Sequence, residues 1–132
     1  MLVTIGPDGR PRPVPICFVL DPSHPVLYTP LDEKPKATDD PLRLARVTDI
    51  QADPRVSVLV DRWDENWDRL AWVRILGRAS LLQPAADSGA HGEVVTGLRA
   101  KYPQYASHDL EARPIIRIGI QDARSWGALD AS

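Results

Sequence analysis

The residues best suited to bind an anion lie in one stretch of the chain, between residues 34 and 46. Lys34 and Lys36 are two of the three lysines in the sequence, and Arg43 follows on a predicted helix. Cations this close repel one another unless an anion lies between them, and phosphate suits both lysine and arginine. Nearby carboxylates could instead neutralise these charges in a solvated loop: Asp32, Glu33, Asp39 and Asp40. The charges alone therefore leave both interpretations open.

Four tryptophans are many for a chain of this size, and two of them stand in a polar loop. Trp63 and Trp67 lie where large aromatic side chains indicate an interface or a flat ligand. The alternative is that they pack over the mouth of a barrel or along a dimer seam. Trp72 is expected in the core, and Trp126 lies in the C-terminal tail. A phosphate site with exposed aromatic side chains suggests a nucleotide-like cofactor with a flat ring.

Other catalytic and metal-binding patterns are missing from the sequence. It contains no G-x-x-x-x-G-K-[ST], G-x-G-x-x-G, H-E-x-x-H or G-x-S-x-G motif. The histidines, His24, His91 and His108, are far apart, so we expect no metal site. Cys17 lies among apolar residues with no obvious base nearby, as is typical of an inert buried thiol. We predict no catalytic side chain.

The composition is that of an ordinary globular protein. The 132 residues are 43% hydrophobic and 26% charged, which predicts a single domain over residues 1–132. The net charge of −2 argues against general nucleic-acid binding. The single cysteine excludes a disulfide framework, and we find neither an apolar run long enough to cross a membrane nor a signal peptide. We therefore expect a cytoplasmic protein.

Hydrophobic periodicity and turn residues predict six strands and two helices. The strands are expected over residues 1–5, 13–20, 26–29, 55–62, 69–83 and 114–120, and the helices over 41–52 and 85–102. The first three strands would form a meander that starts with an Asp-Gly turn, and Gly77 would be a bulge or kink. The first half of the second helix, with two glycines, should be irregular. The predicted fold is mainly β (α+β), a small antiparallel barrel with helices outside.

Several of these segments together resemble a known family. The stretches L-Y-T-P-L-D-E-K-P-K (27–36) and D-P-R-V-S-V-L-V (53–60) are similar to the pyridoxamine 5′-phosphate oxidase-like, FMN-binding split-barrel family. The opening residues 3–18 resemble its first hairpin, and residues 73–82 resemble its long central strand. The K-P-K element, V-D-R-W-D-E-N-W (60–67) and K-Y-P-Q-Y (101–105) resemble a branch of probable deazaflavin (F-420)-dependent oxidoreductases.

The resemblance implies a homodimer of six-stranded split β-barrels with two cofactor sites at the subunit interface. In this family, basic residues after the third strand hold the cofactor phosphate, and here these are Lys34 and Lys36, with Arg43 assisting. The second strand would line the ring through its backbone. The remaining implied cofactor-binding residues are Pro15, Ile16 and Cys17 on that strand, Thr29, and Trp63, Trp67 and Trp126, which could close the site from the other subunit.

The chain also departs from the family pattern in two ways. Family members commonly begin with a helix before the first strand, whereas this sequence starts at the strand. It also lacks the C-terminal segment of true pyridoxamine phosphate oxidases, which argues against that specific activity.

The leading functional hypothesis is an oxidoreductase that uses reduced F-420 to pass a hydride to a small organic molecule. The first alternative is the same fold binding FMN; Arg43 and Arg46 favour F-420, because its acidic tail is longer. A second alternative is a non-catalytic flavin or haem binder, in which His24 or His108 would be the axial ligand. A purely structural role is the third. The sequence does not specify the substrate.

Overall fold

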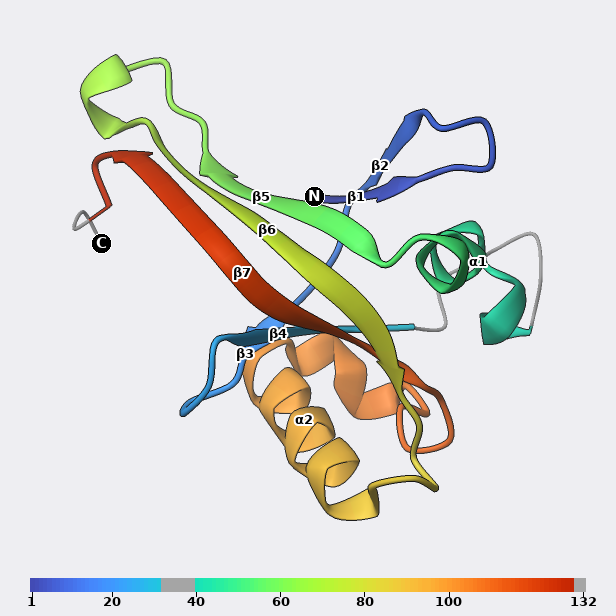
Figure 1. Cartoon of the computed structure of the whole chain (residues 1–132). Helices are drawn as coiled ribbons and strands as arrows, with labels where there is room; N and C mark the ends of the chain where they lie inside the picture. Colours follow the sequence, from blue (N-terminus) through green and yellow to red (C-terminus); the bar gives the residue numbers. More distant parts are fainter. Residues whose placement is uncertain (32–39, 130–132) are drawn as a thin grey trace.

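The chain folds into one curved antiparallel sheet with two helices packed against it (Figure 1). The computed structural model describes residues 1–31 and 40–129. Seven strands follow the order β2-β1-β5-β6-β7-β4-β3. The edge strands β2 and β3 are consecutive in the sequence, and the four residues 15–18 that join them reach at most about 17 Å. The sheet must therefore curl until its two edges approach each other, as in a barrel with a gap.

The first hairpin forms as the sequence predicts. β1 (Leu2–Ile5) pairs with β2 (Pro11–Val14) around the Asp8-Gly9 turn. Gly9 has a φ of 78°, a left-handed conformation that glycine adopts without steric cost, and its N–H donates to the Gly6 carbonyl. The Asp8 carboxylate accepts a hydrogen bond from the Arg10 N–H, which closes the turn. The Asp-Gly dipeptide was therefore sufficient to predict this turn from the sequence.

The predicted strand over residues 13–20 is wrong, because this stretch divides into the end of β2 and the short β3 (Val19–Leu20). The predicted meander is also wrong. β3 pairs with β4 (Val26–Pro30), and β2 pairs with β1 at the opposite edge of the sheet. Pro13 and Pro15 have no N–H to donate, so the stretch that contains them suits a sheet edge and a crossing better than a ladder interior. This division explains why the sheet has seven strands rather than six.

Three long strands form the centre of the sheet: β5 (Arg55–Arg62), β6 (Ala71–Leu82) and β7 (Ile115–Gly127). β5 has the predicted bounds. The register of β6 and β7 shifts between Leu76 and Gly77, which confirms the predicted bulge. The predicted end of the last strand at residue 120 is wrong, since β7 continues along β6 and places Trp126 opposite Trp72. The supposed tail is therefore part of the sheet.

The prediction of one helix over residues 41–52 is also only partly correct, because the 3-10 turn η1 (Pro41–Arg43) precedes the helix α1 (Ala45–Ala52). The second helix, α2 (Ser88–Lys101), is regular from its first residue, contrary to the expectation of an irregular first half. The Asp87 carboxylate caps it by accepting from the Ala90 N–H, which offsets the weak helix propensity of Gly89 and Gly92. Two further 3-10 turns are η2 (Trp67–Arg69) and η3 (Pro103–Ser107).

Each helix covers its own apolar core. α1 contributes Val47 and Ile50 to a cluster with buried side chains of β1, β4, β5, β6 and β7. α2 contributes Val94, Val95 and Leu98 to a second cluster with β4 and η3. Successive side chains of β4 face opposite clusters, so this strand lies between the two cores. Within residues 1–31 and 40–129, no helix is long and apolar enough to cross a membrane.

Candidate functional site

The two lysines predicted to bind phosphate, Lys34 and Lys36, lie outside the described residues. The described residues on either side are Leu31, which follows β4, and Asp40, which precedes η1. Arg43 is exposed at the end of η1, directly before the N-cap residue of α1. The Asp40 carboxylate accepts from the Leu42 N–H and so fixes the start of that turn. In the sequence, Lys34 and Lys36 therefore lie between the end of β4 and the start of η1.

The predicted ring-binding residues, Pro15, Ile16 and Cys17, lie in the four-residue crossing 15–18 between the two edges of the sheet. Within the described part of the chain, the N–H groups of Ile16 and Cys17 make no hydrogen bond. Ile16 and Phe18 pack against the first core, whereas Cys17 packs against the second. Pro15 is exposed and Cys17 is half-buried. This stretch consequently offers backbone donors that no neighbouring strand uses.

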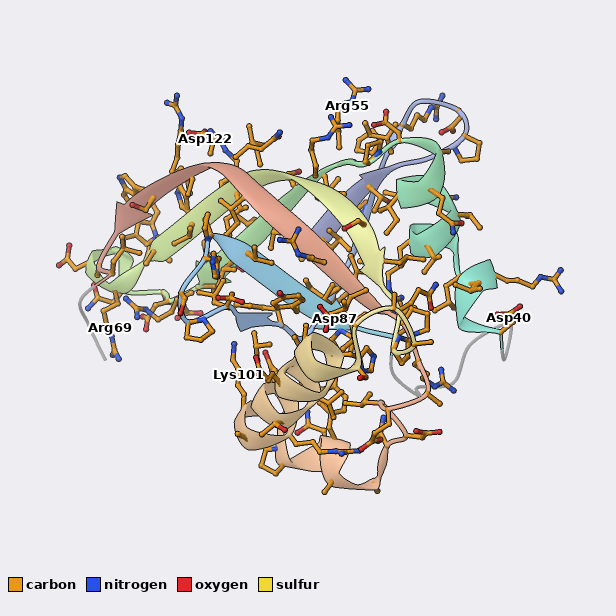
Figure 2. The ribbon with its side chains drawn as sticks, turned by 60° about the horizontal axis from the view of Figure 1, so that its bottom comes forward. Asp40, Arg55, Arg69, Asp87, Lys101 and Asp122 are labelled. Carbon is orange, nitrogen blue, oxygen red and sulfur yellow. The ribbon has the colours of Figure 1, made fainter. Side chains whose placement is uncertain are left out.

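The C-terminal end of α2 holds this segment in place. The Phe18 N–H donates to the Tyr102 hydroxyl at 3.1 Å, and the hydroxyl lies 3.2 Å from the Phe18 carbonyl, to which it donates. Lys101 Nζ donates to the same carbonyl at 2.8 Å and lies 3.8 Å from the centre of the Phe18 ring, a favourable cation–π distance. Figure 2 shows Lys101 extending from α2 towards β3. Two side chains that lie 83 and 84 residues further along the chain thus define the geometry of the crossing.

Thr29, another predicted cofactor-binding residue, carries an unsatisfied buried hydroxyl. It is 1% exposed in β4, and its Oγ1 has no hydrogen-bond partner among the described residues. Its side chain faces the same way as those of Leu27 and Leu31, towards the first core. A buried hydroxyl without a partner costs about 1–3 kcal/mol, so this one calls for a partner from outside the described residues.

An ion pair between the exposed Arg12 of the first hairpin and the buried Asp49 of α1 was not foreseen from the sequence. Arg12 on β2 makes two hydrogen bonds to the carboxylate of Asp49, at 2.9 Å and 2.6 Å, and the Thr4 hydroxyl donates a third at 2.7 Å. The Asp49 side chain is 2% exposed, whereas that of Arg12 is 43% exposed. No local pattern signals this pair, because 37 residues separate its members.

The environment of Asp49 favours its ionised form. Desolvation raises the pKa of this carboxyl group, but the hydrogen bonds from Arg12 and Thr4 and the charge of Arg12 together lower it below the ordinary value. The hydrogen bonds that Arg12 donates to Asp49 raise the pKa of the Arg12 guanidinium. Both groups therefore remain charged at neutral pH, and α1 is tied to the hairpin electrostatically.

The predicted tryptophans do not lie near Arg43. Trp63 and Trp67 follow β5, whereas Arg43 precedes α1 at the other end of that strand. The seven residue steps of β5, at about 3.3 Å each, separate these ends by about 23 Å. Figure 2 shows Arg69 of the tryptophan loop and Asp40, which precedes η1, on opposite sides of the molecule. One copy of the chain thus does not bring the two groups together.

The outer face of the sheet exposes large apolar side chains. Leu59, Leu76 and Trp126 are 38%, 46% and 52% exposed, and Trp63 and Trp67 are 74% and 75% exposed. Residues 121–127 of β7 are exposed on both faces. A cavity of about 470 Å³ opens over β1, β5 and β6, where Trp72, expected in the core, is half-buried and lies 5.5 Å beneath the Arg74 guanidinium. Large exposed apolar patches are typical of surfaces that bind a partner or a ligand.

The histidines have local roles. The His24 side chain is 73% exposed and contacts the Asp21 carboxylate, and His91 is buried with its Nε2 2.7 Å from the Arg113 carbonyl. His108 stacks edge-on against Tyr105. No group of three metal-ligating side chains occurs in residues 1–31 and 40–129.

The curled antiparallel sheet, with its gap between β2 and β3 and its flanking helices, defines a split β-barrel. Residues 1–127 match the family model described as pyridoxamine 5′-phosphate oxidase, and this chain belongs to that family. No protein of curated function matches the sequence.

Solved structures with the same fold have diverse descriptions. The conserved hypothetical protein Rv2991 from Mycobacterium tuberculosis is 23% identical, with a TM-score of 0.72 over 96% of this chain and 74% of its own. An FAD-binding protein from Mesorhizobium loti is 22% identical, with a TM-score of 0.64 over 94% and 82% of the two chains. The haem storage protein HutZ from Vibrio cholerae is 13% identical, with a TM-score of 0.67 over 96% and 82%. At these identities the likeness concerns the fold alone.

Proposed function

We propose that this chain is an oxidoreductase that binds reduced F-420 and transfers a hydride from it to a small organic substrate. The observation that carries the proposal is the crossing 15–18, where the N–H groups of Ile16 and Cys17 make no hydrogen bond within the described residues and Phe18 is held by the Tyr102 hydroxyl. The buried Thr29 hydroxyl on β4, which also has no partner among the described residues, is a second polar group. These groups fit the polar edge of a flat ring. The cofactor supplies the hydride, and the protein binds, orients and excludes water. Its proposed location is the cytoplasm.

Each predicted site residue has a place in this proposal. Lys34 and Lys36 bind the cofactor phosphate with Arg43, since lysine acts as a point charge and arginine as a fork. Pro15, Ile16 and Cys17 face the ring, with Thr29 as a further polar contact. No side chain is assigned as an acid or base.

F-420 is preferred to FMN because of its charge. Its tail beyond the phosphate is longer and more acidic, and Arg43 and Arg46 extend the basic region along η1 and α1. The FAD-binding relative of the same fold supports a flavin-like ligand. FMN is the alternative within the same site. The haem storage relative makes a non-catalytic haem binder the second alternative, with His24 or His108 as the axial ligand.

A homodimer is part of the proposal. The apolar outer face of the sheet needs a cover, and Trp63 and Trp67 lie about 23 Å from the Arg43 end of β5. A second copy, related by a two-fold axis across this face, would bring the tryptophan loop of one subunit towards the phosphate-binding end of the other. Trp63, Trp67 and Trp126 would then close the partner's cofactor site.

Replacing both Lys34 and Lys36 by alanine is expected to weaken F-420 binding about 100-fold, because each lost charge-assisted contact contributes about 1.5 kcal/mol. Quenching of tryptophan fluorescence during titration with F-420, and separately with FMN and haem, measures the affinities. Arg10→Ala, which removes an exposed cation from the hairpin turn, is the control and should bind like the wild type. Unchanged binding by the double variant would refute the phosphate site. Preferential binding of FMN or haem by the wild type would instead select one of the alternatives.

Replacing Leu76 by aspartate is expected to convert the dimer to monomers. Leu76 is 46% exposed on the outer face and lies opposite Asp122, so the new carboxylate would be desolvated beside a like charge in the proposed interface. Sedimentation velocity measures the mass. Leu20→Asp makes the same change at a 58% exposed position on β3 and should remain dimeric. A wild-type protein that sediments as a monomer contradicts the proposed dimer.

A further inference from the structure

A cavity of about 330 Å³ lies between α2 and the β3–β4 hairpin, on the side of the sheet that α2 covers (Figure 1). Small-molecule sites have volumes of about 300–1,000 Å³, so this cavity is large enough to hold a ligand. Val19 and Val94 form part of its apolar wall. Of the predicted cofactor-binding residues that the structure describes, none lines it. The cavity is therefore separate from the proposed cofactor site.

Small residues on α2 keep this space open. Ala90 and Gly97 lie two turns apart on the face of the helix that lines the cavity. Apart from α2 itself, no described atom lies within 4 Å of a Cβ built at Gly97. Glycine is disfavoured inside a helix relative to alanine, so this residue gives the cavity room at a cost in helix stability.

A buried hydroxyl without a partner lies at the wall of the cavity. Tyr28 of β4 is 8% exposed, and its side chain packs in the second core beneath α2. Its hydroxyl makes no hydrogen bond to any described residue and is not fully enclosed by described atoms. Buried polar groups are normally hydrogen-bonded, and Tyr28 lines the cavity, so a ligand there can supply the missing partner.

Two carboxylates give the cavity a negative charge. Asp21 lines it from the β3–β4 turn, and Glu93 lines it from α2. The Ser23 and His24 N–H groups donate to Oδ1 of Asp21, which leaves Oδ2 without a hydrogen bond in the described part of the chain. The hydrogen bond from Ser23, followed by those from His24, lowers the pKa of Asp21, so this carboxyl group is ionised at neutral pH.

The basic side chains of α2 do not cancel this charge. Arg99 forms an ion pair with Glu111, and Lys101 Nζ donates to the Phe18 carbonyl. No lysine or arginine occurs among the described residues that line the cavity, and Glu93 makes no ion pair with any described residue. An apolar cavity with carboxylates and no basic side chain favours a ligand with a positive charge.

We propose that this cavity binds a small organic cation, a protonated amine that carries an apolar group. The ammonium group donates a hydrogen bond to the Tyr28 hydroxyl and is attracted by the carboxylates of Asp21 and Glu93. The apolar group packs against Val19 and Val94. The inference goes beyond the proposed function, because it needs neither F-420 nor the residues that bind it.

The test compares three small molecules with the same aromatic group and different charges. Phenethylamine is a cation at neutral pH, phenethyl alcohol is neutral, and phenylacetate is an anion. Titration of the full chain, followed by amide chemical shifts, measures the three affinities. The amine is expected to bind about tenfold more tightly than the alcohol, the value of one charge-assisted contact, and phenylacetate should not bind.

Gly97→Leu fills the cavity and is expected to abolish binding of the amine. Leucine favours a helix more than glycine does, so the variant should remain folded. Gly92→Leu is the matched control, since it makes the same change in α2 at an exposed glycine that does not line the cavity. It should bind the amine like the wild type.

Tyr28→Phe, as a second variant, removes only a hydroxyl that makes no hydrogen bond to the described residues. Its thermal stability should equal that of the wild type, and its affinity for the amine should fall about tenfold. An unchanged affinity would overturn the role of this hydroxyl and with it the assigned site.

Three other results would overturn the inference. They are equal affinities for the amine and the alcohol, amine binding that survives Gly97→Leu, and the absence of chemical-shift changes at about 10 mM amine. The variant in which alanine replaces both Lys34 and Lys36 separates this inference from the proposed function. It should bind phenethylamine like the wild type whether or not it binds F-420, so either proposal can fail while the other holds.

Discussion

Replacing Arg12 by alanine is expected to lower the free energy of unfolding by about 3 kcal/mol at neutral pH, the lower end of the range for a broken buried ion pair. The Asp49 carboxylate, 2% exposed, would then keep only the hydrogen bond from Thr4. The value lies at the lower end because the Arg12 side chain is itself 43% exposed. Urea denaturation followed by circular dichroism measures the change.

The nearby Arg10→Ala variant is the control. Arg10 pairs with Asp8 at the surface, with an 85% exposed side chain, so its removal should cost less than about 0.5 kcal/mol. Equal losses from the two variants would show that the Asp49 pair contributes no more than a surface pair.

The deficit of the Arg12→Ala variant should shrink in acid. In the wild type the pKa of Asp49 is lowered by folding, so its contribution is complete above about pH 4, the unfolded value, and is lost as the pH falls through the folded value. In the variant, desolvation without Arg12 raises that pKa, and protonation then relieves the buried charge. The denaturation curves of the wild type and the Arg12→Ala variant should therefore lie closer together at pH 4 than at pH 7.

Replacing Gly77 by alanine is expected to destabilise the sheet by about 2–3 kcal/mol, as for an overpacked core. A Cβ at this position would lie 2.5 Å from the Gly119 carbonyl oxygen and 2.8 Å from Ile118 Cγ2. The first of these is backbone in the middle of the β6–β7 pairing, at the register shift, so the clash cannot be relieved by a side-chain rotation. Thermal unfolding monitored by circular dichroism is the measurement.

Replacing Gly92 by alanine is expected to have the opposite effect on stability from Gly77→Ala. Apart from the neighbouring residues and backbone of α2 itself, no described atom lies within 4 Å of a Cβ built there. The residue is inside α2, so alanine should stabilise the protein by about 0.5–1 kcal/mol. A Gly77→Ala variant as stable as the wild type would mean that the bulge can widen without loss of pairing.

Local patterns in the sequence were sufficient wherever a residue type limits its own backbone or a strand has one clear inner face. The Asp8-Gly9 turn depends on a conformation that glycine adopts freely, and β5 has the predicted bounds because Val56 and Val58 alternate inward. Gly77 was predicted as a bulge, and the β6–β7 register confirms it. The split-barrel class followed from these elements and the family resemblance. The roles of Lys34, Lys36 and the other predicted site residues remain predictions.

Features that depend on partners distant in the sequence were decided by the tertiary structure alone. Residues 13–20 look like one strand, but their two halves pair with β1 and β4 at opposite edges of the sheet. Residues 121–127 have little inward periodicity, and they form a strand because β6 offers its backbone groups beside them. Three other features arise in the same way: the Arg12–Asp49 ion pair, the hydrogen bonds between Tyr102 and Phe18, and the separation of Trp63 from Arg43. The free energy that favours one strand pairing over another comes from contacts between distant segments. A local sequence pattern indicates only which conformations a single segment can adopt.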